Sequence, residues 1–232
     1  MNYRVAVIED DDLLRANYVD ALKSQGYQVE SFENRTDAIE VFQSRLPDLA
    51  IIDIGLGDEI DGGFALCQWL RQKSATLPII FLSARDGDID IVSGLRMGAD
   101  DYLTKNISLP HLTARVAALF RRQDALSGSF EEKEDRVEVG RLVLDVKRLT
   151  CSWNSEPVEL TLTEFWMVYA LAKRPGHVRN RDQLMQESQL VVDENTVTSH
   201  VKRIRRKFRE LDDSFEQIDT VYGMGYRWLD DI

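Results

Sequence analysis

The chain has 232 residues, of which 44% are hydrophobic and 30% charged, and its net charge is −11 at pH 7. This composition is typical of a globular protein with one large domain or two small ones. No apolar run approaches the roughly 20 residues that a membrane helix needs. The first residues, MNYRVAVIEDDD, lack the pattern of a secretory signal peptide, so we expect neither a leader nor a membrane partner.

The charge is unevenly distributed. Residues 1–122 carry a net charge of −6, residues 123–136 carry −3 and residues 137–232 carry −2. Six of the 14 basic residues in the last segment lie between Lys202 and Arg209. One basic stripe in an acidic chain predicts a local contact with an anionic partner. The two cysteines, Cys67 and Cys151, are far apart in the sequence, which favours a reducing cytoplasm over a disulfide framework.

The first 122 residues alternate between two hydrophobic patterns. Segments with helical periodicity separate short apolar runs, which lie at 4–8, 27–32, 49–53, 78–83 and 101–104. Strands that alternate with helices predict a doubly wound α/β domain, with a five-stranded parallel sheet covered by helices on both faces.

Residues 123–136 lack any periodicity and are expected to form a linker. The pattern then changes to short strands followed by three helices. The first helix is expected to be capped by Thr161 or Thr163 and to stop at Pro175-Gly176. The last elements are a long basic helix and a hairpin with Gly223 and Gly225 at its turn. Residues 137–232 are therefore expected to form a second, α+β domain.

Charged and hydroxyl side chains end the strands of the first domain. Ligand sites in parallel sheets lie at the carboxyl ends of the strands. The side chains expected to meet there are Glu9, Asp10, Asp53, Ser83 and Lys105. Converging carboxylates repel one another unless a cation lies among them, and hard oxygen ligands suit Mg²⁺. With a lysine and a hydroxyl nearby, such a carboxylate can accept a phosphoryl group.

A plainer interpretation exists for any one of these acids, because aspartate at a strand end is often only a turn residue or a helix cap. Asp11 and Asp12 are interpreted in this way, as caps of a helix that starts near Leu13. The acids Asp58, Glu59 and Asp61, which follow Asp53, are interpreted as solvated charge.

A helical projection of residues 195–211 separates two faces. The core face is expected to contain Val197, Val201, Ile204, Phe208 and Leu211. The opposite face and its flanks hold small polar and basic side chains. An ordinary solvated helix is the alternative, but a face nearly all of one sign that begins with small polar residues suits the major groove of DNA. The candidate contacts are Asn195, Thr198, Ser199, His200, Lys202, Arg203, Arg205 and Arg206.

Residues 1–122 resemble the receiver domain of two-component response regulators, most clearly in GADDYLTK at 98–105. The resemblance implies a flavodoxin-like fold with Asp53 as the phosphoacceptor. It implies Mg²⁺ as the cofactor, held by Glu9, Asp10, Asp53 and the carbonyl of Gly55. It also implies that Ser83, Tyr102 and Lys105 act as phosphoryl-binding or switch residues.

Residues 137–232 resemble the winged-helix output domain of the OmpR/PhoB class, which implies a regulator of transcription, not an enzyme. The implied partners are a sensor histidine kinase, double-stranded promoter DNA, RNA polymerase and a second copy of the chain. The hairpin would add Thr220 and Tyr222 to the DNA contacts, with tyrosine where the family often has arginine. The implied receiver dimer uses Asp100, Asp101, Arg115 and Arg122, and pairing within one chain is the alternative for these residues. The stretches GLGDEIDGGF, TEFWMVYALA and TSHVKRIRRKF also resemble a proteobacterial subgroup associated with dedicated sortase systems.

Two positions depart from the receiver pattern. Asn106 follows Lys105 where a cis-proline is usual, and a cis bond before a non-proline residue costs about 3 kcal/mol. Either the loop has this strained bond or Lys105 is presented differently. Gly57 replaces a proline in the loop after Asp53. These departures keep open a receiver that works without phosphorylation. An aspartyl-phosphate phosphatase is a further alternative, but it would need a second aspartate where Gly55 stands.

Overall fold

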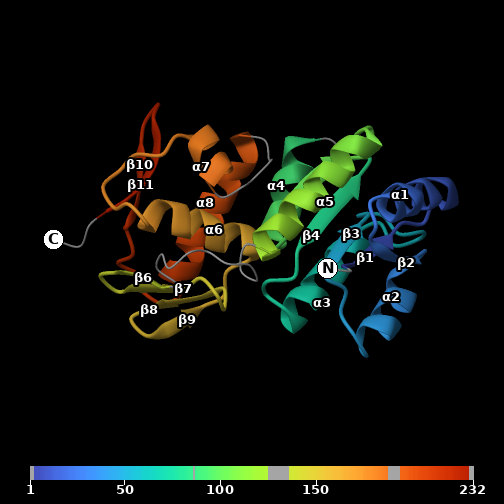
Figure 1. Cartoon of the computed structure of the whole chain (residues 1–232), viewed down its shortest axis with the longest axis horizontal. Helices are drawn as coiled ribbons and strands as arrows, with labels where there is room; N and C mark the ends of the chain where they lie inside the picture. Colours follow the sequence, from blue (N-terminus) through green and yellow to red (C-terminus); the bar gives the residue numbers. More distant parts are fainter. Residues whose placement is uncertain (1–2, 86, 125–135, 188–193, 230–232) are drawn as a thin grey trace. The chain divides into compact units, whose positions relative to one another are not determined.

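The computed structural model describes residues 3–85, 87–124, 136–187 and 194–229. The chain divides into two compact units, residues 1–117 and 118–232 (Figure 1). We call them the receiver unit and the winged-helix unit. The expected linker falls mostly on 125–135, outside the described residues, so the expected domain boundaries stay a prediction.

The receiver unit contains a five-stranded parallel sheet in the order β2-β1-β3-β4-β5. Its strands are β1 (Arg4–Ile8), β2 (Gln28–Phe32), β3 (Leu49–Ile52), β4 (Ile79–Ser83) and β5 (Asp101–Thr104). Its helices are α1 (Asp12–Ser24), α2 (Arg35–Phe42), α3 (Gly62–Lys73), α4 (Asp88–Arg96) and α5 (Leu109–Asp124), and α5 continues past residue 117 into the second unit. This strand order is the flavodoxin-like one, which confirms the predicted fold class.

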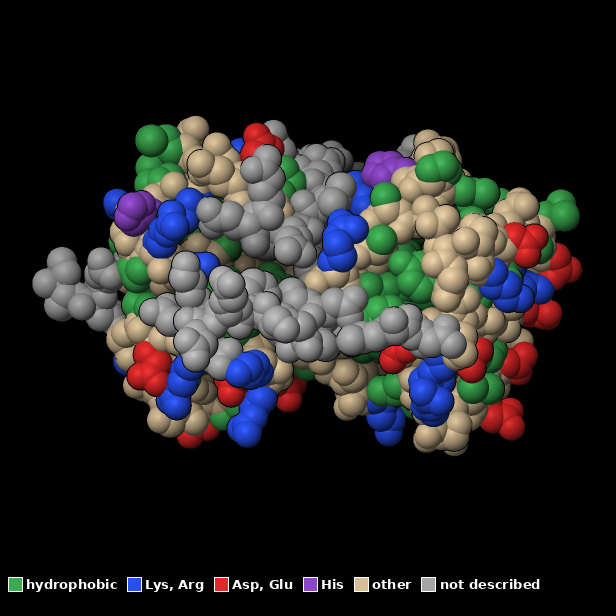
Figure 2. All heavy atoms as spheres, in the orientation of Figure 1, with side chains coloured by type: hydrophobic (Ala, Val, Ile, Leu, Met, Phe, Trp, Pro, Cys, Tyr) green, Lys and Arg blue, Asp and Glu red, His purple; other side chains and the backbone are tan. Residues whose placement is uncertain are grey.

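Strands β1, β3 and β4 are buried on both faces of the sheet. Alternate side chains of β1, β3 and β4, such as Ile8, Ile52 and Phe81, pack against α2, α3 and α4 in one hydrophobic cluster. The intervening side chains, such as Val7 and Ile51, point to the opposite face, where α1 and α5 lie. Helix α1 begins as expected, because the Asp11 carboxylate accepts two backbone N–H bonds of 2.9 Å. Figure 2 shows acidic side chains gathered along the outer edge of this unit, where Figure 1 places α1, β2 and α2.

The winged-helix unit combines small antiparallel sheets with three helices. A four-stranded sheet consists of β6 (Arg136–Val139), β7 (Leu142–Asp145), β8 (Thr150–Trp153) and β9 (Glu156–Val158). The helices α6 (Leu162–Ala172), α7 (Arg181–Glu187) and α8 (Glu194–Arg209) follow. Strands β10 (Ile218–Val221) and β11 (Gly225–Trp228) form the C-terminal hairpin.

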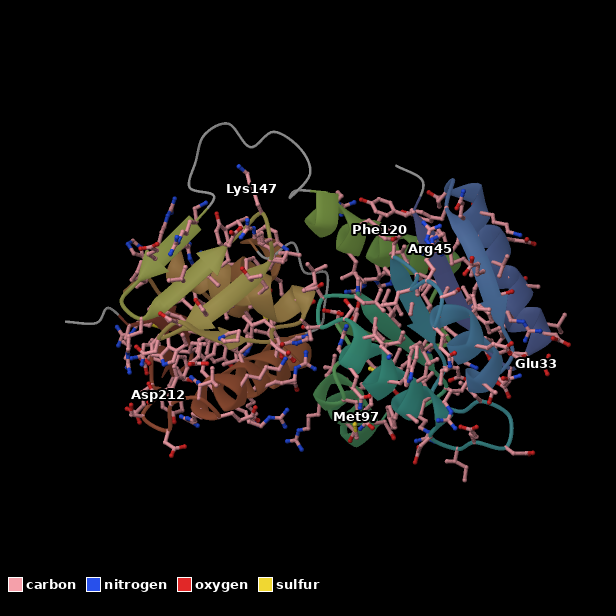
Figure 3. All side chains as sticks on the ribbon, turned by 90° about the horizontal axis from the view of Figure 1, so that it is seen from below. Glu33, Arg45, Met97, Phe120, Lys147 and Asp212 are labelled. Atoms are coloured by element: carbon pink, nitrogen blue, oxygen red, sulfur yellow. The ribbon has the colours of Figure 1, made fainter. Side chains whose placement is uncertain are left out.

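Aromatic packing holds α8 against the strands of this unit. The rings of Phe208 and Phe215 stack with centroids 4.5 Å apart, and Trp153 and Trp228 pack edge-on around them. The Trp153 indole donates to Asp212 just beyond α8, and Figure 3 shows Asp212 at the edge of the unit. The helix ends at Arg209, so the prediction that Leu211 lies on its core face is wrong: this side chain is 45% exposed.

Both cysteines are buried thiols, and burial raises the pKa of Cys151 to about 12. Within the described ranges, no helix has the length and apolarity required to cross a bilayer.

Candidate functional site

The tips of neighbouring strands bring the predicted acids together. Glu9 and Asp10 follow β1, and Asp53 follows β3, which lies beside β1 in the sheet. One carboxylate oxygen from each of these three residues lies within 4.8 Å of the others. Glu9 and Asp53 are buried, whereas Asp10 is exposed. The convergence predicted from the sequence is therefore present in the structure.

Lys105 joins this cluster from the end of β5. Its Nζ lies 2.6 Å from Glu9 Oε1 and 2.7 Å from Asp53 Oδ2. Burial raises the pKa of both carboxyl groups, and the hydrogen bonds from Lys105 oppose that shift. The positive charge of Lys105 thus neutralises part of the negative charge of Glu9 and Asp53.

Lys105 is presented without a cis bond. Every peptide bond among the described residues is trans, including the bond to Asn106. A turn after β5 positions the lysine. The backbone N–H of Lys105 donates to the Ser83 carbonyl at 2.8 Å, and the Ile107 N–H donates to the Thr104 carbonyl at 3.0 Å. The Thr104 hydroxyl also donates to the Asn106 side chain. Of the two options that the sequence left open, the structure contains the second, a different presentation of Lys105.

The loop after β3 lies against the acids. The Gly57 N–H donates to Asp10 Oδ2 at 3.1 Å, with a φ of +61° that favours glycine. Proline has no N–H group and could not make this bond. Gly63, at the start of α3, packs directly on the Asp53 carbonyl, because a Cβ added there would lie 2.0 Å from that oxygen. Gly55 lies two residues beyond Asp53, and its carbonyl as a metal ligand stays a prediction.

Two of the expected switch residues, Ser83 and Tyr102, lie on the adjacent strands β4 and β5, and Arg85 connects them. Ser83 is buried at the end of β4, and its Oγ accepts the Arg85 N–H at 3.2 Å. The Tyr102 hydroxyl donates to the Arg85 carbonyl at 2.8 Å. A Cβ on Gly94 of α4 would lie 2.7 Å from the Tyr102 ring, so this glycine makes room for the tyrosine. Sequence reasoning missed Arg85, because no motif or periodicity singles it out.

The expected dimer residues are corrected in part. Asp100 cannot belong to an exposed interface, because its side chain is fully buried and pairs with Arg71 of α3 at 2.7 Å. The position before β5 faces α3, and a carboxylate buried there requires a cation. Asp101 and Arg115 pair within the chain, with nitrogen and oxygen 3.5 Å apart, as the plainer alternative allowed. The Arg122 side chain lies outside the described part of the chain.

Helix α8 separates its basic residues into two groups. Lys202 and Arg206 are exposed, as expected for a DNA-contacting face. His200 and Arg203 are buried, so their assignment as DNA contacts is wrong. Arg203 forms an ion pair with Glu164 of α6, whose carboxylate is fully buried, and a second Arg203 nitrogen lies 3.0 Å from His200 Nδ1.

Glu164 is the residue that sequence reasoning overlooked here. Its Oε2 lies 2.7 Å from Lys207 Nζ, in addition to the contact with Arg203. It also completes a capping box with Thr161, which settles the cap of α6. Burial would raise the pKa of Glu164, but Arg203 and Lys207 outweigh it and lower that pKa to about 2. The T-x-x-E pattern could have revealed the cap, but not the partners on α8.

The open face of α8 and the hairpin border a hollow of about 300 Å³, lined by Lys202, Thr220 and Tyr222 among others. Arg205 anchors the hairpin, because its guanidinium donates to the Ile218 carbonyl and the Thr220 hydroxyl. The Tyr226 hydroxyl contacts Thr198 of α8 at 3.3 Å. Ser199 is half-buried beside this face, and the Asn195 side chain lies outside the described part.

The tip of the hairpin is more apolar than expected. Tyr222 is 94% exposed, and Met224, which the sequence did not single out, is 61% exposed. We refer to residues 222–224 as the wing tip.

A phosphoacceptor-type pocket on a flavodoxin-like sheet, followed by a winged helix, defines the class of response regulators that bind DNA. The model of the response regulator receiver domain matches residues 5–117, and that of the C-terminal domain of transcriptional regulatory proteins matches residues 155–228. The chain belongs to the OmpR/PhoB class of response regulators.

Several curated relatives are similar over nearly their whole length. The transcriptional regulatory protein AfsQ1 of Streptomyces coelicolor is 37% identical, covering 95% of this chain and 96% of the relative. CreB of Escherichia coli is 34% identical, covering 96% of each. A solved structure of a RitR mutant has a TM-score of 0.76 at 22% identity, over 99% of this chain and 100% of that one. At this identity, the structural match supports the fold alone.

The three carboxylates fit a divalent cation. Glu9, Asp10 and Asp53 supply hard oxygen donors within 4.8 Å of one another, and Asp10 is open to water, which Mg²⁺ prefers to retain. Burial away from water raises the pKa of Glu9 and Asp53, and a bound cation would favour their charged forms.

Proposed function

We propose that this chain is a phosphorylation-controlled regulator of transcription that accepts a phosphoryl group on Asp53 from a sensor histidine kinase in the cytoplasm. The observation that carries the proposal is the position of Lys105 Nζ, 2.7 Å from Asp53 Oδ2 and 2.6 Å from Glu9. This arrangement places a nucleophilic carboxylate, a cation and the Ser83 hydroxyl at adjacent strand tips.

The transfer follows from the contacts of Asp53. Its Oδ1 accepts the Ile54 N–H at 2.7 Å, which orients the carboxylate. An oxygen of Asp53 forms a bond to phosphorus while the phosphorus–nitrogen bond of a phosphohistidine breaks, and the histidine nitrogen keeps the electron pair and takes up a proton. Lys105 and Ser83 then bind oxygens of the phosphoryl group. Glu9, Asp10 and Asp53 would hold Mg²⁺, which would neutralise further charge on those oxygens.

The winged-helix unit is proposed to bind promoter DNA. We propose that Lys202 and Arg206 contact DNA phosphates and that Thr198, Thr220 and the wing tip lie close to the grooves. Two receivers would pair through α4, β5 and α5, so that two winged helices bind tandem half-sites. Met97, which directly follows α4 and lies at the periphery of the receiver unit in Figure 3, and Leu109 of α5 are each 37% exposed and would supply apolar contact. RNA polymerase is a further proposed partner at the promoter.

The test is size-exclusion chromatography and DNA binding with and without Mg²⁺ and beryllofluoride, a mimic of the phosphoryl group. We expect beryllofluoride to increase dimerisation and DNA affinity of the wild type and to leave Asp53→Asn unchanged. A wild type that does not respond would instead support the alternative, a DNA-binding regulator whose receiver works without phosphorylation.

A further inference from the structure

Arg85 makes polar contacts in three directions. Its backbone N–H and carbonyl contact the two expected switch side chains, Ser83 at 3.2 Å and Tyr102 at 2.8 Å. Its guanidinium donates to the Ile60 carbonyl at 2.6 Å and to Asp61 Oδ1 at 3.1 Å. One residue therefore joins the end of β4, the start of β5 and the loop after β3.

The loop after β3, residues 54–61, is part of the phosphoacceptor pocket. It provides the Gly57 N–H that binds the Asp10 carboxylate. Its other side is tied to α2 by an ion pair between Arg35 and Glu59, with nitrogen and oxygen 2.9 Å apart. Among the described residues, Arg35 and Arg85 are thus the basic side chains that form ion pairs with this loop.

Arg85 also has a second acidic neighbour. Its guanidinium lies 3.8 Å from Asp90 on α4, compared with 3.1 Å from Asp61. The Arg85 and Asp61 side chains are 33% and 65% exposed, so their ion pair is weak and sensitive to salt. Arg85 Nη1 is therefore within ion-pair distance of both acids, and the guanidinium can favour one or the other.

We propose that Arg85 is a positioning residue that clasps the loop after β3 through Asp61 and releases it towards Asp90 when Asp53 is phosphorylated. This inference rests on the proposed function. A phosphoryl group on Asp53 draws the Ser83 hydroxyl towards it, which pulls on the Arg85 N–H, and Tyr102 follows through the Arg85 carbonyl. The clasp then has two states, with Arg85 paired to Asp61 or to Asp90, and phosphorylation of Asp53 favours the second.

The experiment measures hydrogen exchange of the backbone amides of residues 56–62 in the full chain, with and without Mg²⁺ and beryllofluoride. In the wild type, we expect beryllofluoride to speed exchange in this loop about two- to fivefold, the range for loss of an exposed ion pair. In Arg85→Gln and Asp61→Asn, exchange is expected to be fast already and not to respond. Asp58→Asn, which changes another exposed acid of the same loop, is the matched control and should behave like the wild type.

A charge swap distinguishes the clasp from a general structural role. The double variant Arg85→Glu with Asp61→Arg should regain slow exchange without beryllofluoride, whereas each single charge reversal should not. The clasp is overturned if Arg85→Gln protects the loop like the wild type, or if beryllofluoride raises wild-type DNA binding and leaves the loop unchanged. If beryllofluoride changes neither loop exchange nor DNA binding, the proposed function itself is wrong.

Discussion

Arg203 of α8 and Glu164 of α6 form an ion pair in the interior of the winged-helix unit, with side chains only 3% and 0% exposed. Lys207 holds the second oxygen of the same carboxylate. Charges at this depth are tolerated only when they are paired, and removal of one partner leaves an uncompensated charge. The basic residues of α8 therefore divide into those that hold the helix in place and those that are open to a partner.

Replacement of Arg203 by alanine should lower the free energy of unfolding by about 3–5 kcal/mol, because Glu164 keeps only Lys207 as a charged partner. Urea denaturation followed by tryptophan fluorescence would measure this loss. An Arg203→Ala variant as stable as the wild type would show that the pair contributes nothing to the fold.

Replacement of the exposed Arg206 by alanine should change the free energy of unfolding by no more than about 0.5 kcal/mol. It should weaken DNA binding and reduce the slope of log affinity against log salt by about 0.9, the value for one lost phosphate contact. Fluorescence anisotropy over a series of salt concentrations would measure the slope. An unchanged slope would show that Arg206 makes no phosphate contact and that this face of α8 is ordinary solvated surface.

Glu164 should also control stability in acid. Its pKa is lowered to about 2 in the folded chain, against about 4.3 for an unperturbed glutamate. Its contribution is therefore present above about pH 4.3 and is lost as the pH falls towards about 2. In Glu164→Gln, the free energy of unfolding should be lower at neutral pH and depend less on pH in this window. Urea titrations at several pH values would measure it, and equal pH dependence in both proteins would contradict the prediction.

Substitution of Gly63 by alanine should directly disturb Asp53, the proposed phosphoacceptor. The added Cβ would lie 2.0 Å from the Asp53 carbonyl oxygen, so the backbone at Asp53 must move. We expect a loss of about 1–3 kcal/mol of stability and much slower phosphorylation by acetyl phosphate. Gly26→Ala is the control, since Gly26 has a φ of +86° but no neighbouring atom within 4 Å of a Cβ. It should cost only backbone strain, about 1–2 kcal/mol, and leave phosphorylation intact.

The wing tip should accept an arginine. Tyr222 is 94% exposed, so Tyr222→Arg should leave stability nearly unchanged. An added cation near the narrow groove should tighten DNA binding and raise the salt slope by about 0.9. Anisotropy titrations of both proteins at several salt concentrations would show the difference. Identical slopes would mean that the wing tip does not reach the DNA backbone.

Much of the receiver unit could be predicted from the sequence, because its signals are local. The apolar runs predicted every strand of the receiver unit to within about one residue. Because Glu9, Asp10, Asp53 and Lys105 follow the ends of parallel strands, the sequence also predicted that their side chains meet. Turn geometry was less accessible. The sequence indicated that Asn106 and Gly57 were unusual, but not that a trans peptide could still aim Lys105 or that the Gly57 N–H would bind Asp10.

Two of the errors share one cause: each concerns a charged residue whose partner is distant in the sequence. Asp100 pairs with Arg71, 29 residues away, and Arg203 pairs with Glu164, 39 residues away. Periodicity treats charge as a sign of exposure and cannot detect a buried partner.

The sequence by itself determined the class of each domain, the acids at the strand tips and the exposed basic face with Lys202 and Arg206. It could do so because strands and helices bury their apolar side chains at different, regular spacings along the sequence. Only the tertiary structure decided which charges are buried in pairs, as at Glu164 and Arg203, and which connect loops, as at Arg85. The physical reason is that a charge is tolerated in the interior only beside a partner, and the fold chooses that partner.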